Sequence, residues 1–180
     1  MKTENKKCLI AYYSRRGYNY VNGAIENLTV GNTEVVANKI KERVNGDLFK
    51  IDTIIPYPSD YMETTRVAKA ELHSNARPDL ANLANNMEQY EVVFLGYPNW
   101  WGTFPMAVFT FLESSSFNGK TIIPFCTHEG SGLGISEKDI KRLCPAAKVL
   151  KGVAIKGSDV ANSDNIIDSW IEAIRKQALL

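Results

Sequence analysis

The sequence predicts an α/β fold in which helices cover both faces of a parallel sheet. Three short apolar runs, at residues 8–13, 91–96 and 121–126, are typical of strands that are buried on both faces. Helical patterns lie between these runs, so strands and helices alternate along the chain. This alternation favours a doubly wound sheet with right-handed crossovers, and in such sheets ligands bind beyond the carboxyl ends of the strands.

Two weaker runs, at residues 48–51 and 149–155, complete a set of five expected strands. Pro124 lies inside the run at 121–126 and has no backbone N–H to donate. We therefore expect this strand to be short, or to lie where that donor is not needed.

Five segments carry helical periodicity. The first ends before Gly46, which is the expected C-terminal cap, and the fourth begins at Ser136, which is the expected N-cap. Residues 106–112 are apolar almost all round and should be buried. The last helix has an apolar stripe formed by Ile166, Trp170, Ile171 and Ile174. The expected helices cover residues 34–44, 61–72, 106–112, 136–143 and 166–174.

The composition is that of one globular domain, which we expect to cover residues 1–180. Charged residues make up 23% of the chain and the net charge is +1. Such a small net charge does not create an electric field strong enough to attract nucleic acid or an anionic membrane. No stretch approaches the ~20 apolar residues of a membrane span, and no secretory signal is visible. Cys8, Cys126 and Cys144 lack CxxC spacing and are expected to be buried free thiols. We expect a cytoplasmic protein with no metal, nucleic acid or membrane partner.

The loop after the first expected strand has the features of an anion site. Ser14-Arg15-Arg16-Gly17 follows the strand directly, and Gly31-Asn32-Thr33 opens the next helix after an intervening stretch at residues 18–30. A helix start offers free backbone N–H groups and a positive dipole end. Ser14 adds a hydroxyl, and one of the two arginines adds a cation. The alternative is that Asn32 or Thr33 only caps the helix.

Two adjacent tryptophans lie in the loop after the third expected strand, which reads Pro98-Asn99-Trp100-Trp101-Gly102. Neighbouring side chains point different ways, so both rings cannot easily reach the core from one loop. A large ring is costly to leave in water without a partner, and a planar aromatic ligand would cover it by stacking. The alternative is an ordinary core or interface tryptophan.

The loop after the fourth expected strand, Thr127-His128-Glu129-Gly130-Ser131-Gly132, is small, polar and rich in glycine. Such a backbone can approach the edge of a heterocycle. His128 and Glu129 are alternatively a general acid and base, or His128 is simply a hydrogen-bonded surface residue. The glycine run at 130–134 has near-dinucleotide spacing but follows a late strand, so a flexible turn is the better explanation.

Together these loops resemble those of the flavodoxin-like family, and the likeness covers nearly the whole chain. Ser14 to Gly17 is similar to the start of the family's phosphate loop, although Arg16 stands where a hydroxyl residue is usual and residues 18–30 split the loop. Gly96 to Gly102 is similar to the flavin-stacking loop, and Thr127 to Gly132 is similar to the second flavin loop.

The resemblance implies a flavodoxin-like sheet of five parallel strands in the order 2-1-3-4-5, with FMN as the cofactor. The first loop would hold the phosphate and the two later loops would hold the ring. No catalytic side chain is implied, because electron transfer needs no protein acid or base. The residues implied to bind the cofactor are Ser14, Arg16, Gly31, Asn32, Thr33, Pro98, Asn99, Trp100, Trp101, Gly102, Thr127, His128, Glu129, Gly130, Ser131 and Gly132.

The chain also resembles a bacterial branch of the family that has an extended first loop and a Tyr-Pro dipeptide after the second strand, here Tyr57-Pro58. Ala76-Arg77-Pro78 is similar to a further feature of that branch. Arg77 would then approach the flavin or a substrate. The alternative is a salt bridge from Arg77 to Asp79 or Glu71.

Three functions stay open at this point. The first is an electron-transfer flavodoxin that serves a redox partner protein, although carriers of this family are usually acidic and this chain has 21 basic and 20 acidic residues. The second is an NAD(P)H-dependent FMN enzyme that reduces a small quinone-like substrate or a flavin, with Tyr18, Asn19 and Tyr20 in a substrate lid. The third is a module that binds another planar ligand, or none.

Overall fold

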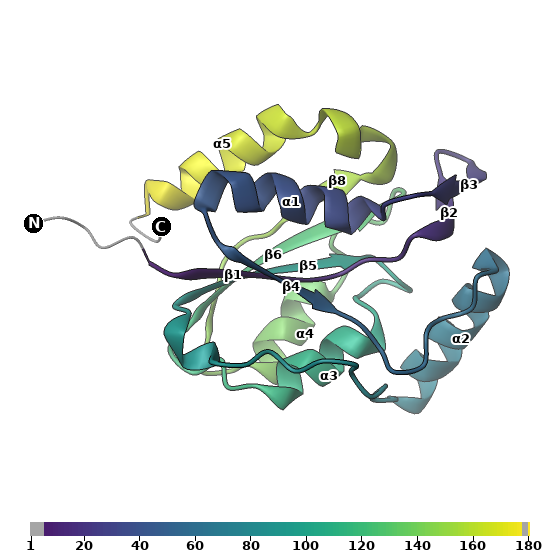
Figure 1. The fold of residues 1–180 in the computed structure, drawn as a ribbon, viewed down its shortest axis with the longest axis horizontal. Helices are drawn as coiled ribbons and strands as arrows, with labels where there is room; N and C mark the ends of the chain where they lie inside the picture. The colour runs from purple at the N-terminus through teal and green to yellow at the C-terminus, as the bar shows by residue number, and fades with distance from the viewer. Residues whose placement is uncertain (1–5, 178–179) are drawn as a thin grey trace, which may run out of the picture.

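The computed structural model describes residues 6–177 and residue 180, and Figure 1 shows its three layers. The central sheet is parallel throughout, and its strands follow the order β4-β1-β5-β6-β7, with β8 also paired to β6. In chain order this is the expected arrangement 2-1-3-4-5. The strands are β1 (Cys8–Tyr13), β4 (Asp47–Ile51), β5 (Val92–Pro98), β6 (Thr121–His128), β7 (Lys148–Val149) and β8 (Val153–Lys156).

The helices fall into two layers and one outlying element. In Figure 1, α1 (Asn32–Val44) and α5 (Asp164–Arg175) cover one face of the sheet, and α3 (Met106–Ser114) and α4 (Ser136–Leu143) cover the other. The helix α2 (Tyr61–Ser74) lies beyond the carboxyl end of the sheet. Two short 3-10 helices, η1 (Met87–Gln89) and η2 (Gly157–Asn162), complete the set. None of the helices in the described part of the chain is long and apolar enough to cross a membrane.

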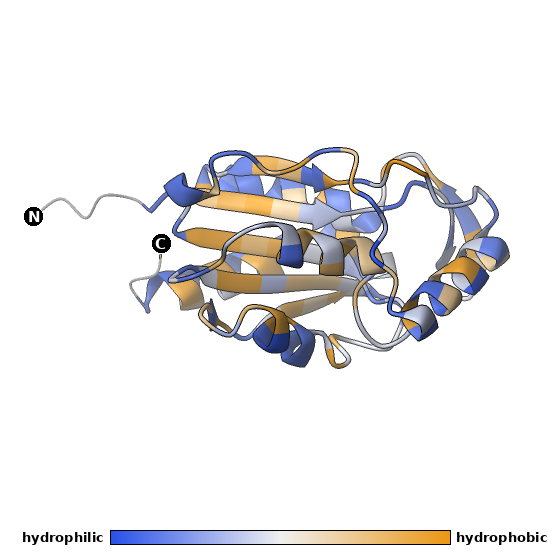
Figure 2. Cartoon of the chain, turned by 90° about the horizontal axis from the view of Figure 1, so that it is seen from below, coloured by the Kyte–Doolittle hydropathy of each residue, from blue (hydrophilic) through white to orange (hydrophobic). Residues whose placement is uncertain are grey.

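The strands β1, β5 and β6 are buried on both faces, as their continuous apolar runs predicted. Along β1, Leu9 and Ala11 join the core beneath α3 and α4, whereas Cys8 and Ile10 join the core beneath α1 and α5. Figure 2 shows the hydrophobic colour concentrated in the central strands. All three cysteines are buried and free, and burial raises the pKa of Cys126 to about 12, so this thiol is inert at neutral pH.

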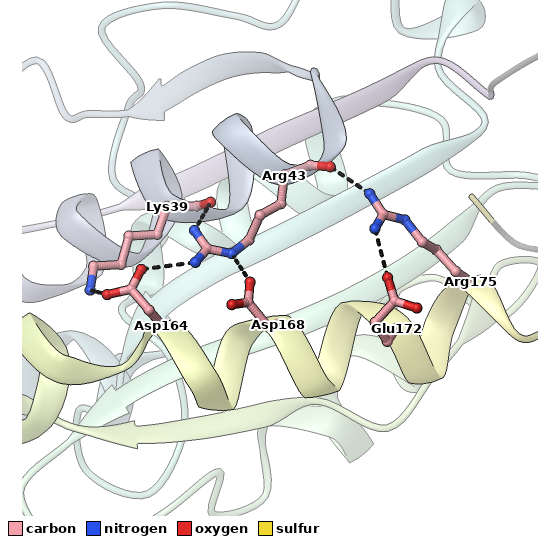
Figure 3. Close-up of polar contacts among 6 residues, drawn as sticks. All are labelled: Lys39, Arg43, Asp164, Asp168, Glu172 and Arg175. Carbon is pink, nitrogen blue, oxygen red and sulfur yellow. Dashed lines mark hydrogen bonds and ion pairs between the residues drawn. The ribbon is translucent and has the colours of Figure 1, made fainter.

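The two helices of the α1–α5 layer are joined by ion pairs along their outer edge (Figure 3). Asp164 accepts hydrogen bonds from Lys39 Nζ at 2.6 Å and from Arg43 Nη2 at 2.8 Å. Arg43 also pairs with Asp168 through Nε. Arg175 donates to the carbonyl oxygen of Arg43 at 2.6 Å, so the contacts join the carboxyl-terminal half of α1 to both ends of α5.

The apolar stripe of α5 differs by one residue from the prediction. Ile167, Ile171 and Ile174 are buried, whereas Ile166 is 47% exposed. Trp170 is partly buried and packs edge-on against Phe94. Because helical spacing of three and four residues fits both isoleucines at the start of the helix, the pattern alone did not decide which one faces the sheet.

Both predicted helix caps were wrong. Asn45, not Gly46, occupies the left-handed cap position of α1, with φ 50°. Ile135 precedes the first residue of α4, and Ser136 is fully buried instead of capping the helix. The Ser136 hydroxyl accepts from Tyr97 at 2.8 Å and donates to the Leu133 carbonyl at 2.6 Å, so it serves tertiary packing.

The strand with Pro124 is long, and the fifth strand is broken beside it. β7 pairs with residues 121–122 of β6, and β8 pairs with residues 125–128. Within the described residues, Pro124 therefore lies where the fifth strand has a gap in its pairing. The missing N–H is tolerated there, which matches the second of the two expected outcomes.

The stretch between β1 and α1 is a β-hairpin, which the sequence interpretation had left irregular. It consists of β2 (Gly17–Val21) and β3 (Ala24–Leu28), paired antiparallel. Asn22 and Gly23 form its two-residue turn, with φ of 48° and 94°. In Figure 1 the hairpin lies at the carboxyl end of the sheet, on the same side as α2. The Asn-Gly dipeptide is a strong hairpin signal, and it was the signal missed.

Candidate functional site

A cavity of about 250 Å³ lies at the carboxyl ends of β1, β5 and β6. We call it the edge cavity. It collects residues from all three loops that the sequence singled out, together with the first turn of α1. The predicted binding residues that line it are Ser14, Asn32, Thr33, Pro98, Asn99, Trp100, Thr127, His128, Glu129 and Ser131.

The amino terminus of α1 lines the edge cavity through Asn32 and Thr33. Gly31 is the N-cap and makes no side-chain cap hydrogen bond, and the Ser14 hydroxyl accepts from the N–H of Glu34 at 3.0 Å. A Cβ atom on Gly31 would lie 2.3 Å from Ser14 Oγ, so only glycine lets the β1 loop approach the helix this closely. Within the described residues, the N–H groups of Asn32 and Thr33 have no hydrogen-bond acceptor, as expected for a first helical turn. This end suits an anion.

A buried hydroxyl pair connects this helix end to the sheet. Thr33 Oγ1 lies 2.7 Å from Thr127 Oγ1, and both threonines are buried. Thr33 comes from α1 and Thr127 from the end of β6, so the hydrogen bond fixes the helix start over the strand end. Thr33 therefore acts in positioning the helix as well as in lining the cavity.

The tryptophan loop, which is a tight turn, also lines the cavity through Pro98, Asn99 and Trp100. Trp100 and Thr103 exchange two backbone hydrogen bonds, at 2.8 and 3.3 Å. The two residues between them, Trp101 and Gly102, have φ of 56° and 89°. A left-handed backbone at a bulky residue such as Trp101 is unusual and is found mainly where the surrounding structure imposes it. The turn separates the two indole rings, as the sequence suggested.

Trp100 is held by two tyrosines. The rings of Tyr13 and Tyr57 meet the indole edge-to-face, with centroid distances of 5.4 and 5.1 Å. The Tyr57 hydroxyl donates to Glu71 on α2 at 2.6 Å, and burial is the main cause that raises the pKa of the Glu71 carboxyl. This arrangement fixes the plane of the Trp100 ring at the cavity wall.

The loop after β6 is tied to the tryptophan turn. Asn99 Nδ2 donates to the Gly132 carbonyl at 2.7 Å, and Asn99 Oδ1 accepts from the N–H of Gly102 at 3.0 Å. His128 Nδ1 accepts from the N–H of Gly130 at 2.9 Å. Glu129 Oε2 accepts from the N–H of Asn22 at the tip of the hairpin, at 3.0 Å.

His128 and Glu129 thus each bond to backbone groups, and no hydrogen bond between them exists among the described contacts. The general acid and base pair that the sequence left open is not assembled here. The second carboxylate oxygen, Glu129 Oε1, is buried and has no hydrogen-bond partner within the described residues. A buried acceptor without a donor is costly, so this atom would gain from a ligand hydroxyl.

Several predicted binding residues do not line the edge cavity. Gly31, Gly102, Gly130 and Gly132 form the backbone of the loops around it. Trp101 is 50% exposed and borders a neighbouring cavity between α2 and the tryptophan turn, which we call the α2 cavity. Arg16 is exposed, and the structure does not bring it to either cavity.

Arg15, not Arg16, is the arginine that reaches the site. It donates through Nη2 to the carbonyl oxygens of Pro58 and Ser59, both at 2.8 Å, and through Nη1 to Tyr18. It thereby joins the hairpin to the loop before α2. Burial lowers the pKa of the guanidinium, which nevertheless stays charged at neutral pH. Nothing in the dipeptide itself distinguished the two arginines.

The remaining lining residues come mostly from the hairpin and α2. Tyr20 of β2 stacks on Tyr61 of α2, with ring centroids 6.3 Å apart. Reading Asn22-Gly23 as a hairpin turn would have brought residues 19, 20 and 28 toward the site, but no local pattern identified Tyr61. Arg15 was one of the two candidate cations, and Asn19 and Tyr20 belonged to the predicted substrate lid. The lining residues that the sequence patterns missed are Leu28, Tyr61 and Gly157.

Arg77 makes a salt bridge, but with a partner that differs from both predicted ones. Its Nε and Nη2 atoms pair with the two carboxylate oxygens of Glu113 on α3, at 2.6 and 2.8 Å. Its guanidinium also lies over the ring of Phe109, 5.2 Å from the centroid. Arg77 lines neither the edge cavity nor the cavity beside it, so its role is to attach the segment after α2 to α3.

A doubly wound sheet with these three loops at its carboxyl edge defines a nucleotide- or flavin-binding class of α/β protein. A family model described as Flavodoxin matches residues 7–174, and the chain belongs to the flavodoxin family. Among curated proteins no relative matches the chain.

Solved structures agree with this assignment. A protein from Bacteroides eggerthii, assigned as a flavoprotein, is 30% identical over 91% of this chain and 99% of its own, with a TM-score of 0.70. A similarly assigned protein from Bacteroides uniformis is 26% identical over 94% of this chain and 99% of its own, with a TM-score of 0.74. A flavoprotein from Lactobacillus acidophilus, solved in complex with FMN, shares the fold at 19% identity, 89% and 99% coverage and a TM-score of 0.62.

Proposed function

We propose that this protein binds FMN in the edge cavity and acts in electron transfer. The observation that carries the proposal is the combination of two features in one cavity. The cavity is lined both by a helix amino terminus suited to an anion and by an aromatic ring that two tyrosines hold in place. FMN carries a matching phosphate and flat ring, joined by a polyol chain.

The residues present fit this group. The first turn of α1 and Ser14 would hold the phosphate through N–H and O–H groups. The unpartnered Glu129 Oε1 would accept from a hydroxyl of the polyol chain. Trp100 would cover one face of the ring system. Bound FMN would supply the redox chemistry, and the chain would supply binding and tuning of the potential.

The fit predicts selectivity for the phosphate. Flavin-free protein should bind FMN one-to-one and quench its fluorescence, and the protein as purified should show flavin absorbance bands. Riboflavin, which lacks the phosphate, should bind about tenfold more weakly or worse, equivalent to ~1.4 kcal/mol. Equal affinity for FMN and riboflavin would contradict the assignment of the phosphate to the first turn of α1 and Ser14. If the protein bound neither flavin, the proposed function would be wrong.

A second function, an NAD(P)H-dependent FMN quinone or flavin reductase, is favoured by one observation. The hairpin and α2 meet beside the edge cavity through Arg15 and through Tyr20 on Tyr61, which gives the site a wall beyond the strand loops. Direct bleaching of bound flavin by NADPH, followed by turnover with a quinone, would support this reductase. Reduction that requires a separate reductase protein would support the carrier.

A further inference from the structure

The β2–β3 hairpin lines the edge cavity without being part of the central sheet. Its two strands pair only with each other in the described part of the chain. Asn19, Tyr20 and Leu28 of the hairpin nevertheless line the cavity. Figure 1 shows the hairpin beyond the carboxyl end of the sheet, which is the end where the cavity lies. The hairpin is therefore an added wall of the site that the sheet does not hold in place.

The hairpin has almost no apolar core of its own. Among residues 17–28, all of which the structure describes, only Val21 is buried, and every residue of β3 except Leu28 is exposed. A two-stranded hairpin without a covered apolar face is marginally stable in water. Its position over the cavity therefore depends on a few side-chain contacts.

The two ends of the segment that carries the hairpin meet at one fixed place. Gly31 packs against the loop after β1 so closely that a Cβ atom on it would lie 2.6 Å from the carbonyl oxygen of Arg15. Beyond this junction, Gly17 has φ of 84° with open space around it, and residues 29–30 are exposed. Residues 16–30 can therefore turn about the junction as one piece without disturbing the sheet.

The hairpin is held down at its tip and in its middle. The N–H of Asn22 donates to Glu129 Oε2 at 3.0 Å, and Lys156 Nζ donates to Asn22 Oδ1 at 3.4 Å. Both contacts are exposed, so water competes for them and each adds little to the closed position. In the middle, Tyr20 stacks on Tyr61 of α2. Glu129 and Tyr61 both line the edge cavity, so these contacts attach the hairpin to two different walls of the site.

We propose that the hairpin is a hinged flap that opens to admit and release the ligand of the edge cavity, and that Glu129 is the latch for its tip. This inference rests on the proposed FMN site and adds the route by which the cofactor enters and leaves. The closed flap contributes three side chains to the cavity wall, so bound FMN leaves only after the tip contacts break.

A cleavable cross-link tests the flap. Ala24→Cys on β3 and Lys156→Cys on β8 place two thiols across the tip contact, to be joined by a bis-maleimide with a disulfide in its linker. The native cysteines are buried, and burial raises the pKa to about 11 for Cys8 and Cys144 and to about 12 for Cys126, so they stay unreactive. FMN loaded before cross-linking should dissociate about tenfold more slowly, and FMN added after cross-linking should bind about tenfold more slowly. Cutting the linker with a phosphine should restore both rates.

The control cross-link joins α1 to α5, away from the hairpin. Arg43 lies in the last turn of α1 and pairs with Asp168 on α5. The same linker between Arg43→Cys and Asp168→Cys should leave both FMN rates unchanged. Unchanged FMN exchange in the protein cross-linked at the hairpin tip would overturn the flap. Equal slowing by the two cross-links would also overturn it, because the control leaves the hairpin free.

Amide hydrogen exchange tests the latch without any flavin. In the flavin-free protein, Glu129→Ala should make exchange in residues 18–27 about fivefold faster, because the tip loses one hydrogen bond. Glu26 on β3 has the same carboxylate but makes no side-chain hydrogen bond or ion pair among the described residues, so Glu26→Ala should change nothing. Equal exchange in Glu129→Ala and the wild-type protein would overturn the latch. If the wild-type protein bound no FMN before any cross-link, the proposed function would be wrong, whereas the exchange rates would still decide whether Glu129 holds the hairpin.

Discussion

The α1–α5 layer and the part of α2 that lines the cavities, residues 61–68, differ in how they are attached to the rest of the molecule. We call this part of α2 the α2 wall. Helix α5 buries Ile167, Ile171 and Ile174 against the sheet, and ion pairs join it to α1 (Figure 3). Helix α2 buries only Thr64 and Ala68. The first layer therefore supplies stability, whereas the α2 wall shapes cavities and has little apolar area to hold it in place.

The largest expected effect lies in the α1–α5 layer. Ile167→Ala should lower the free energy of unfolding by about 2–5 kcal/mol, because it leaves a cavity in a fully buried position. The exposed neighbour Ile166 provides the control, and Ile166→Ala should cost less than about 0.5 kcal/mol. Urea unfolding measures both. Similar losses in the two variants would mean that α5 does not present this face to the sheet.

The next effect concerns the contact between the hairpin and the α2 wall. Arg15→Met removes the hydrogen bonds to Pro58, Ser59 and Tyr18, whereas Arg16→Met removes a charge from an exposed position. Amide hydrogen exchange at residues 17–28 should become faster in Arg15→Met and stay unchanged in Arg16→Met. Exchange in α1 should be the same in both. Faster amide exchange of the hairpin in Arg16→Met would contradict the assignment of this contact to Arg15.

The smallest effect concerns the ion pairs between α1 and α5. The hydrogen bonds from Lys39 and Arg43 lower the pKa of the Asp164 carboxyl below its usual value of 3.8. The ion pairs therefore stabilise the fold at neutral pH, and this contribution is lost as the pH falls through the lowered pKa of the folded state. Arg43→Gln should destabilise the protein much less than Ile167→Ala, because exposed pairs are screened by water and salt. Its effect should shrink in high salt and in acid. A loss of stability that persisted both in high salt and in acid would instead indicate packing of the aliphatic part of the Arg43 side chain.

The same comparison separates what the sequence predicted from what it did not. Strands buried on both faces leave continuous apolar runs, so the sheet, its alternation with helices and the three loops at its edge could be predicted from the hydrophobic pattern of the sequence. The α2 wall depends on contacts between distant segments. Tyr61 reaches the site because Tyr20 of the hairpin stacks on it and Arg15 holds the segment just before α2. No spacing within α2 predicts these contacts.

Single-residue choices also needed the structure. Arg15 and Arg16 are chemically identical, and only the backbone of the loop decides which one turns inward. Trp100 and Trp101 are separated by a tight turn with left-handed backbone at its tip, and this turn places one ring on the edge cavity and the other beyond it. The helix caps also needed the structure, because Asn45 and not its neighbour Gly46 has the left-handed backbone at the end of α1. At α4, the tertiary hydrogen bond of Ser136 overrode its preference for a cap position.

The most direct test of the account is the FMN affinity of two alanine variants, measured by quenching of flavin fluorescence. Trp100 lines the edge cavity between Tyr13 and Tyr57, whereas Trp101 lines only the α2 cavity. We expect Trp100→Ala to weaken FMN binding by about tenfold or more, and Trp101→Ala to change it by less than about twofold. Equal losses in both variants, or no loss in Trp100→Ala, would contradict the assignment of the edge cavity as the flavin site.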